Sequence, residues 1–136
     1  MRRFKDAARY APVLGSALVP LLLGAAAVRP RTSPPVVDVR LSEWKVEVLA
    51  ATAPAGPVVF RVANAGQIEH AFEVEGKGLE QRSGPIAAGA EGTLSVTLKP
   101  GLYELYCPVG NGAHKQAGMK ATIKVTAEES APSSSY

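Results

Sequence analysis

The chain has 136 residues and a mass of 14.2 kDa, which is the size of one domain. Its 13 glycines and 11 prolines disfavour a helical bundle, and its single cysteine excludes an intramolecular disulfide and a four-cysteine zinc site. Six of the 15 basic residues and one of the 12 acidic residues lie in the first 35 positions, so the remainder, with 9 basic and 11 acidic residues, is nearly neutral and predicts no nucleic-acid partner.

The first predicted element is an export segment at residues 1–28. Four basic residues in positions 1–9 precede an uncharged apolar run at 10–28, which is the order found in a secretory signal. Ala25 and Ala27 would occupy the small-residue positions of a cleavage site. The run is also long enough for a tilted membrane helix, so both a cleaved signal peptide and a retained anchor stay open. Arg2 and Arg3 leave a twin-arginine route open beside the general one.

The remaining chain divides into a linker, a folded domain and a tail. Residues 29–35 are rich in proline and predict a stiff linker, and residues 127–136 predict a disordered polar tail. The folded domain is therefore expected at residues 36–126, as a monomer in the periplasm or another extracytoplasmic compartment. A domain of this size has a modest core, so a bound metal would add to its stability.

Short runs of period two follow one another through this domain. Such runs indicate strands with one buried face, and they lie at residues 37–41, 44–48, 58–62, 72–74, 94–98, 102–107 and 121–125. Glycine- and proline-containing stretches at 53–57, 64–66 and 76–92 predict loops, with a short helical turn at 78–83. The expected fold is an all-β sandwich of about seven to eight strands.

Individual side chains of these strands carry further expectations. Three aromatic residues are predicted to lie in the core, namely Phe72, Tyr103 and Trp44. Three glutamates are predicted to form a solvated acidic face that would steer a basic partner, namely Glu69, Glu73 and Glu75. Asn64 is expected to be a turn residue with a satisfied side chain, whereas Tyr106 either faces solvent or shields the site described next.

Metal-ligating side chains gather around one loop. Cys107 ends a predicted strand on its inward face, six residues separate it from His114, and four more separate His114 from Met119. Three glycines would let this loop turn tightly, so a thiolate, an imidazole and a thioether can converge. The second histidine, His70, shares a predicted strand face with Phe72. Two histidines, a cysteine and a weak axial methionine are the ligands of a blue-copper centre, although zinc could occupy the same ligands.

Three motifs in order resemble the cupredoxins, the superfamily of plastocyanin and azurin. They are V-x-N-x-G-x-x-x-H-x-F from Val62, P-G-x-Y-x-x-x-C from Pro100, and H-x-x-x-G-M from His114, and the resemblance spans residues 58–125. It implies a Greek-key sandwich with one type 1 copper at one end, cycling between Cu(II) and Cu(I). In that case His70, Cys107 and His114 would be the equatorial ligands and Met119 the axial one.

Two positions depart from the cupredoxin pattern. The spacing between Cys107 and His114 is longer than in plastocyanin, where two residues intervene. Ala71 follows the first histidine, where many cupredoxins have asparagine, and this removes a hydrogen bond between the ligand loops.

The resemblance implies a carrier of single electrons rather than an enzyme. Its partner would be a redox protein such as a c-type cytochrome or a membrane oxidase or reductase. A copper-delivery or storage protein on the same fold would use the same ligands, but the chain has no additional histidine and, besides Met119, only Met1. A copper oxidase or nitrite reductase needs further histidines, and a cysteine–histidine hydrolase needs a third orienting group. A purely structural sandwich also stays open.

Overall fold

The computed structural model describes residues 32–127. The predicted signal or anchor and the predicted tail beyond Ala127 therefore lie outside the described residues. Within residues 32–127, no helix is long and apolar enough to cross a bilayer.

Nine strands and one short helix make up the described chain. In order they are β1 (Val36–Ser42), β2 (Lys45–Val48), β3 (Thr52–Pro54), β4 (Gly56–Asn64), β5 (Glu73–Gly76), β6 (Leu79–Arg82), β7 (Glu91–Leu98), β8 (Gly101–Tyr106), α1 (Ala113–Gln116) and β9 (Lys120–Thr126).

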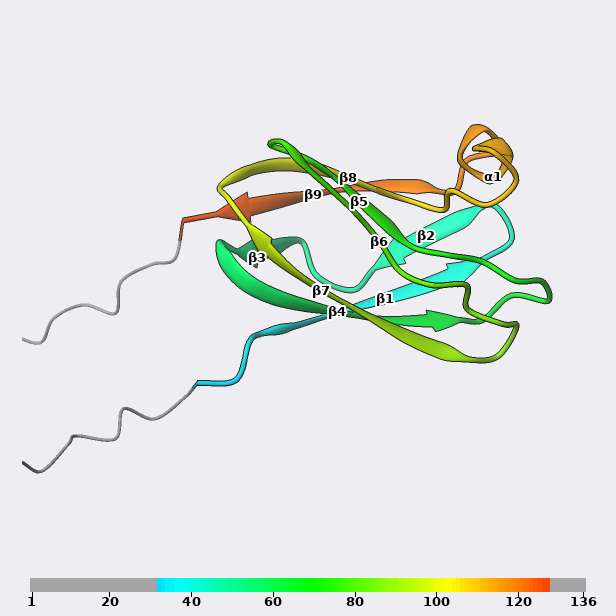
Figure 1. Ribbon diagram of the computed structural model, residues 1–136, viewed down its shortest axis with the longest axis horizontal. Coiled ribbons are helices and arrows are strands. Elements are labelled where there is room, and N and C mark those ends of the chain that lie inside the picture. Colours follow the sequence, from blue (N-terminus) through cyan, green and yellow to red (C-terminus); the bar gives the residue numbers. More distant parts are fainter. Residues whose placement is uncertain (1–31, 128–136) are drawn as a thin grey trace, which may run out of the picture. The chain divides into compact units, whose positions relative to one another are not determined.

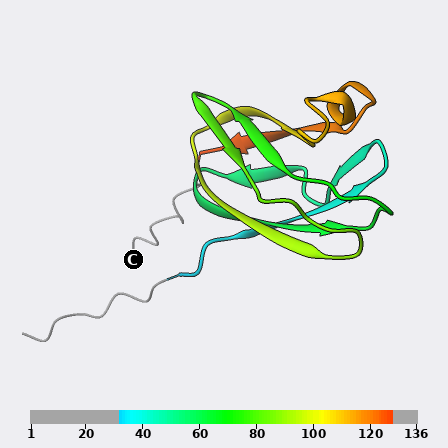
Figure 2. The same cartoon turned by 45° about the vertical axis from the view of Figure 1, so that its right-hand side comes forward.

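The strands form two mixed sheets. The first has the order β2-β1-β4-β7 and the second the order β3-β9-β8-β5-β6. Strand β1 pairs parallel with β4, and β3 pairs parallel with β9, while the other pairs are antiparallel. Figures 1 and 2 show the two sheets as layers, with α1 and the β1–β2 turn at the same end of the sandwich. The predicted all-β sandwich is confirmed.

The core lies between the sheets and follows the period of two. Alternate residues of β4, namely Val58, Phe60 and Val62, are almost fully buried, and Ile123 and Val125 of β9 are buried opposite them in the second sheet. Burying a side chain of this kind contributes about 1.5–3 kcal/mol to folding. Of the aromatic residues expected here, Phe72 packs against Phe60 with ring centroids 5.3 Å apart. Tyr103 is 1% exposed, so both belong to the core.

Two strands occupy stretches predicted to be something else. Strand β6 replaces the predicted helical turn at 78–83, because Lys77 and Gly78 both have positive φ, as the two central residues of a tight hairpin require. Strand β3 overlaps the start of the predicted loop at 53–57. The backbone of β9 supplies its pairing, and Pro54 is tolerated because β3 is an edge strand.

Two side chains were placed wrongly by the sequence. Trp44 is 48% exposed and not core, because it lies in the turn between β1 and β2 with φ of 63°. Glu73 is 2% exposed and not solvated. Its carboxylate accepts hydrogen bonds from Tyr106 Oη at 2.8 Å and from Arg82 Nε at 3.0 Å, which offset the cost of burying it.

Candidate metal centre

Three donor atoms from distant parts of the sequence face one another at one end of the sandwich. Nδ1 of His70 lies 3.3 Å from Nδ1 of His114, and the Sγ of Cys107 lies 3.8 Å and 3.6 Å from these two nitrogens. The structure thus brings together three of the four residues expected to bind a metal, as a cluster within 4.8 Å.

His70 reaches the cluster from the loop between β4 and β5. It does not lie in the predicted strand but in an isolated bridge with Ile86, whose backbone exchanges two hydrogen bonds with it. Asn64 stabilises this loop from within: its amide donates to the carbonyls of Ile68 and Ile86, and its Oδ1 accepts from Gly66 N. Asn64 is 2% exposed and its side chain is satisfied as expected, but it is the last residue of β4 and not a turn residue.

Cys107 follows β8 directly and is completely buried. Its amide donates to the carbonyl of Met119 at 3.1 Å, and the amide of Met119 donates to the carbonyl of His114 at 3.0 Å. The backbone of Met119 therefore lies beside both other residues of this loop, and its side chain is fully buried. A buried thiol is inaccessible to a substrate, which argues against the cysteine–histidine hydrolase.

His114 lies in α1 and is only partly buried. The turn before it depends on three residues with positive φ, Gly110, Asn111 and Gly112, which let the chain reverse after Pro108. The longer spacing between Cys107 and His114 is thus used to form this turn and the helix. The indole of Trp44 meets the His114 ring edge-on, with centroids 5.1 Å apart.

The donor set and its spacing fit a metal ion. At metal–ligand distances of about 2.0–2.3 Å, three nitrogen and sulfur ligands around one ion lie about 3.5–3.8 Å apart in a trigonal plane. The separations of 3.3, 3.6 and 3.8 Å are close to these values. A thiolate with two imidazoles suits copper or zinc. His70, Cys107 and His114 would hold the ion.

The electrostatics of His70 favour the neutral ring that a metal requires. Burial lowers the pKa of His70, and the nearby Glu43 carboxylate opposes this in part. A hydrogen bond from Gln67 N, with another from Ile68 N, lowers the pKa of Glu43, so this carboxylate is ionised at neutral pH.

No protein-family model and no curated protein matches this sequence. Among solved structures, a reduced auracyanin from the photosynthetic bacterium Roseiflexus castenholzii has a TM-score of 0.58 at 17% identity, covering 69% of this chain and 98% of that one. Auracyanin B has a TM-score of 0.56 at 18% identity, covering 71% and 92%. Auracyanin A of Chloroflexus aurantiacus, described as a blue copper protein, has 0.53 at 16% identity, covering 69% and 100%.

The chain has the cupredoxin fold. The resemblance stated from the three motifs is therefore confirmed at the level of the fold. Identities of 16 to 18% show no more than that, so the function rests on the site itself.

Three residues around the candidate metal centre were not expected from the sequence. Glu43 and Trp44 reach it from the β1–β2 turn, and Lys115 covers the neighbouring Tyr106 ring at 3.6 Å from its centroid. Ser42 and Lys45 flank Glu43 and Trp44 and pair with each other across the β1–β2 hairpin. Such a pairing indicates a turn, but it does not indicate which residues the turn contacts.

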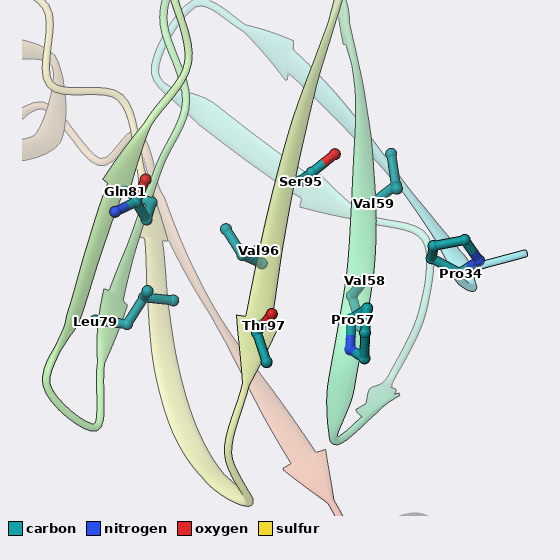
Figure 3. A pocket seen from close by; sticks show the side chains of 9 residues that line it. All are labelled: Pro34, Pro57, Val58, Val59, Leu79, Gln81, Ser95, Val96 and Thr97. Carbon is teal, nitrogen blue, oxygen red and sulfur yellow. The ribbon is translucent and has the colours of Figure 1, made fainter.

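A surface pocket lies apart from the candidate metal centre. Figure 3 shows it between the edge strands β6 and β7 and strand β4. None of its lining residues is ionisable or belongs to the cluster; they are Pro34, Pro57, Val58, Val59, Leu79, Gln81, Ser95, Val96 and Thr97.

Proposed function

We propose that this protein is a type 1 copper protein that carries single electrons between redox partners outside the cytoplasm. The observation that supports this is the set of two imidazole nitrogens and one thiol sulfur, 3.3–3.8 Å apart, at one end of a cupredoxin sandwich. His70, Cys107 and His114 would be the equatorial ligands and Met119 the axial one. Bound copper would supply a one-electron Cu(II)/Cu(I) couple.

The chain's own residues suit such a role. His70 and Cys107 are completely buried, which excludes water from most of the site. Backbone hydrogen bonds hold both ligand loops in place before any ion arrives, so little rearrangement would accompany a change of oxidation state. His114 is partly exposed and is the natural exit for an electron toward a docked partner.

The partner would be a c-type cytochrome or a membrane oxidase or reductase. The basic and apolar residues 1–28 support export, with the domain either released or anchored at the membrane. With both histidines in one cluster, a second histidine-based copper site for catalysis is impossible, and we propose a carrier rather than an enzyme.

The visible absorption spectrum of the purified full chain tests this proposal. One equivalent of Cu(II) should produce an intense blue or green thiolate-to-copper band, which a mild reductant bleaches. Cys107→Ser and His70→Ala should lose the band, because each removes one donor of the cluster. Binding of Cu(I) alone would favour copper delivery or storage, and binding of neither ion would leave a structural sandwich.

A further inference from the structure

The second ring nitrogen of His70, on the side away from the cluster, is buried and has no hydrogen-bond partner. Nε2 of His70 is the one buried side-chain nitrogen or oxygen among residues 32–127 that makes no hydrogen bond. Leaving such a group without a partner costs about 1–3 kcal/mol. The nearest charged group to it is the Glu43 carboxylate, whose Oε1 lies 3.5 Å away.

Glu43 is itself held in place by the loop that carries His70. Its Oε1 accepts hydrogen bonds from Gln67 N at 2.7 Å and from Ile68 N at 3.2 Å. The carboxylate therefore joins the β1–β2 turn to the His70 loop. Ala71 offers no side-chain hydrogen bond. Glu43 connects the His70 loop to the β1–β2 turn, and Asn64 connects it to the segment around Ile86.

The loop also leaves room for this carboxylate. A Cβ atom on Gly66 would lie 2.5 Å from Glu43 Oε1 and 2.9 Å from Oε2. The φ of Gly66 is not positive, so its backbone does not require glycine. The absence of a side chain there is explained by the close approach of Glu43.

We infer that Glu43 is a positioning residue that fixes the ring of His70, with the proton on Nε2 and the lone pair of Nδ1 toward Cys107 and His114. The inference rests on the proposed copper site. In a histidine ligand, a carboxylate on the far nitrogen selects the tautomer and makes the ligating nitrogen more basic. A movement of a few tenths of an ångström brings Oε1 to hydrogen-bond distance, and the Glu43 side chain, 34% exposed, has room to make it.

A carboxylate in this place favours Cu(II), the more highly charged state. Removing it should weaken Cu(II) binding about tenfold while changing Cu(I) binding less, because a supporting residue of this kind typically contributes 10- to 100-fold in affinity. A tenfold change in the ratio of the two affinities raises the one-electron potential by about 59 mV.

Two variants disrupt the contact between Glu43 and His70 in different ways. Glu43→Ala removes the carboxylate, whereas Gly66→Ala leaves it in the chain but pushes it from its place. Glu43→Gln keeps an acceptor oxygen without the charge. Unlike Glu43→Ala, it should therefore keep His70 in the Nε2–H tautomer, and its copper potential should lie between those of the wild type and Glu43→Ala. Glu47→Gln is the matched charge control on the same hairpin, and Gly84→Ala is the matched glycine control, since a Cβ there meets nothing within 4 Å.

The experiment measures the full chain in two states. Nitrogen-15 NMR of the metal-free protein at about pH 8, where histidine is neutral, should show His70 in the Nε2–H form only. Glu43→Ala and Gly66→Ala should show mixed tautomers and, with copper, a raised potential, whereas both controls should match the wild type. Lower thermal stability with an unchanged tautomer and potential would overturn the inference, since Glu43 would then be merely structural. The metal-free spectrum decides this even if copper gives no blue band, which would count against the proposed function alone.

Discussion

Tyr106 and Glu73 form a buried polar pair beside the candidate metal centre. The Tyr106 hydroxyl donates to Oε1 of Glu73 at 2.8 Å, and Arg82 completes the set from the adjoining strand β6. Burial, together with the Glu73 carboxylate, raises the pKa of Tyr106 well above its usual range. Tyr106 thus neither faces solvent nor needs to contact the cluster, and its hydroxyl keeps a buried carboxylate satisfied.

Replacing this hydroxyl should destabilise the fold in a pH-dependent way. Tyr106→Phe leaves Glu73 without one hydrogen bond, and we expect the free energy of unfolding at neutral pH to fall by about 1–3 kcal/mol. Because the raised pKa favours the neutral phenol in the native state, the wild type loses stability above about pH 10, where the unfolded chain ionises first. In urea denaturation, the difference in free energy of unfolding between wild type and variant should be smaller at about pH 11 than at about pH 8. A constant gap would contradict the raised pKa.

At the scale of single residues, the sequence identified the donors but not their supports. His70, Cys107 and His114 could be found because a chain with two histidines and one cysteine offers few alternatives. Glu73 looked solvated because alternation along a strand says nothing about a tyrosine on the neighbouring strand. Glu43 could not be found at all, since its contact with His70 depends on how two loops meet at the end of the sandwich.

Helix α1 is an element that local propensity alone does not sustain. It has four residues, none of them buried, whereas isolated helices need at least about 12 residues to be marginally stable in water. Lys115 fastens it to the second sheet: its ammonium lies over the Tyr106 ring and forms ion pairs with Glu104 and, at 3.9 Å, with Glu75. Because His114 precedes Lys115, this attachment also places a candidate ligand.

Removing the charge of Lys115 should therefore loosen α1 without unfolding the sandwich. We expect Lys115→Met, which retains an unbranched apolar side chain, to lower stability by about 1 kcal/mol and to speed hydrogen exchange at the amides of Gln116 and Ala117. Those amides bond to Gly112 and Ala113 within the helix turn. The control is Lys124→Met, an exposed lysine of β9. Equal exchange rates in both variants would show that α1 does not depend on Lys115.

At the scale of elements, the sequence was reliable where one strand face is buried. Strands β1, β4, β7 and β9 agree with their predicted runs because alternating burial leaves a period of two. Strand β6 has no buried residue, so it left no such pattern, and β3 is only three residues long. Strands β3 and β6 form because their backbones pair with β9 and β5, and not because of a pattern in their own side chains.

For the whole domain, an ion at the candidate centre would connect segments that are remote in sequence. His70 precedes β5, Cys107 follows β8, and His114 lies before β9. A ligand that binds only the folded chain stabilises it by mass action. The modest core of a small domain makes this contribution a considerable part of the total stability.

Copper should accordingly raise the unfolding temperature of the full chain. At a free concentration one hundred times the dissociation constant, binding contributes about 2.7 kcal/mol. His114→Ala should lose most of this gain while keeping the metal-free fold, because His114 is partly exposed and makes no part of the core cluster. Calorimetry of the wild type and of His114→Ala, with and without Cu(II), measures the gain from copper and the stability of the metal-free fold. An equal gain in wild type and variant would place the binding elsewhere.

The exposed position of Trp44 has one more consequence. It is the only tryptophan of the chain, and its indole touches the ring of His114 edge-on. Any tryptophan fluorescence of the protein therefore originates one ring away from the candidate centre, where a paramagnetic ion would quench it. The molecule thus carries an intrinsic optical reporter of its own occupancy.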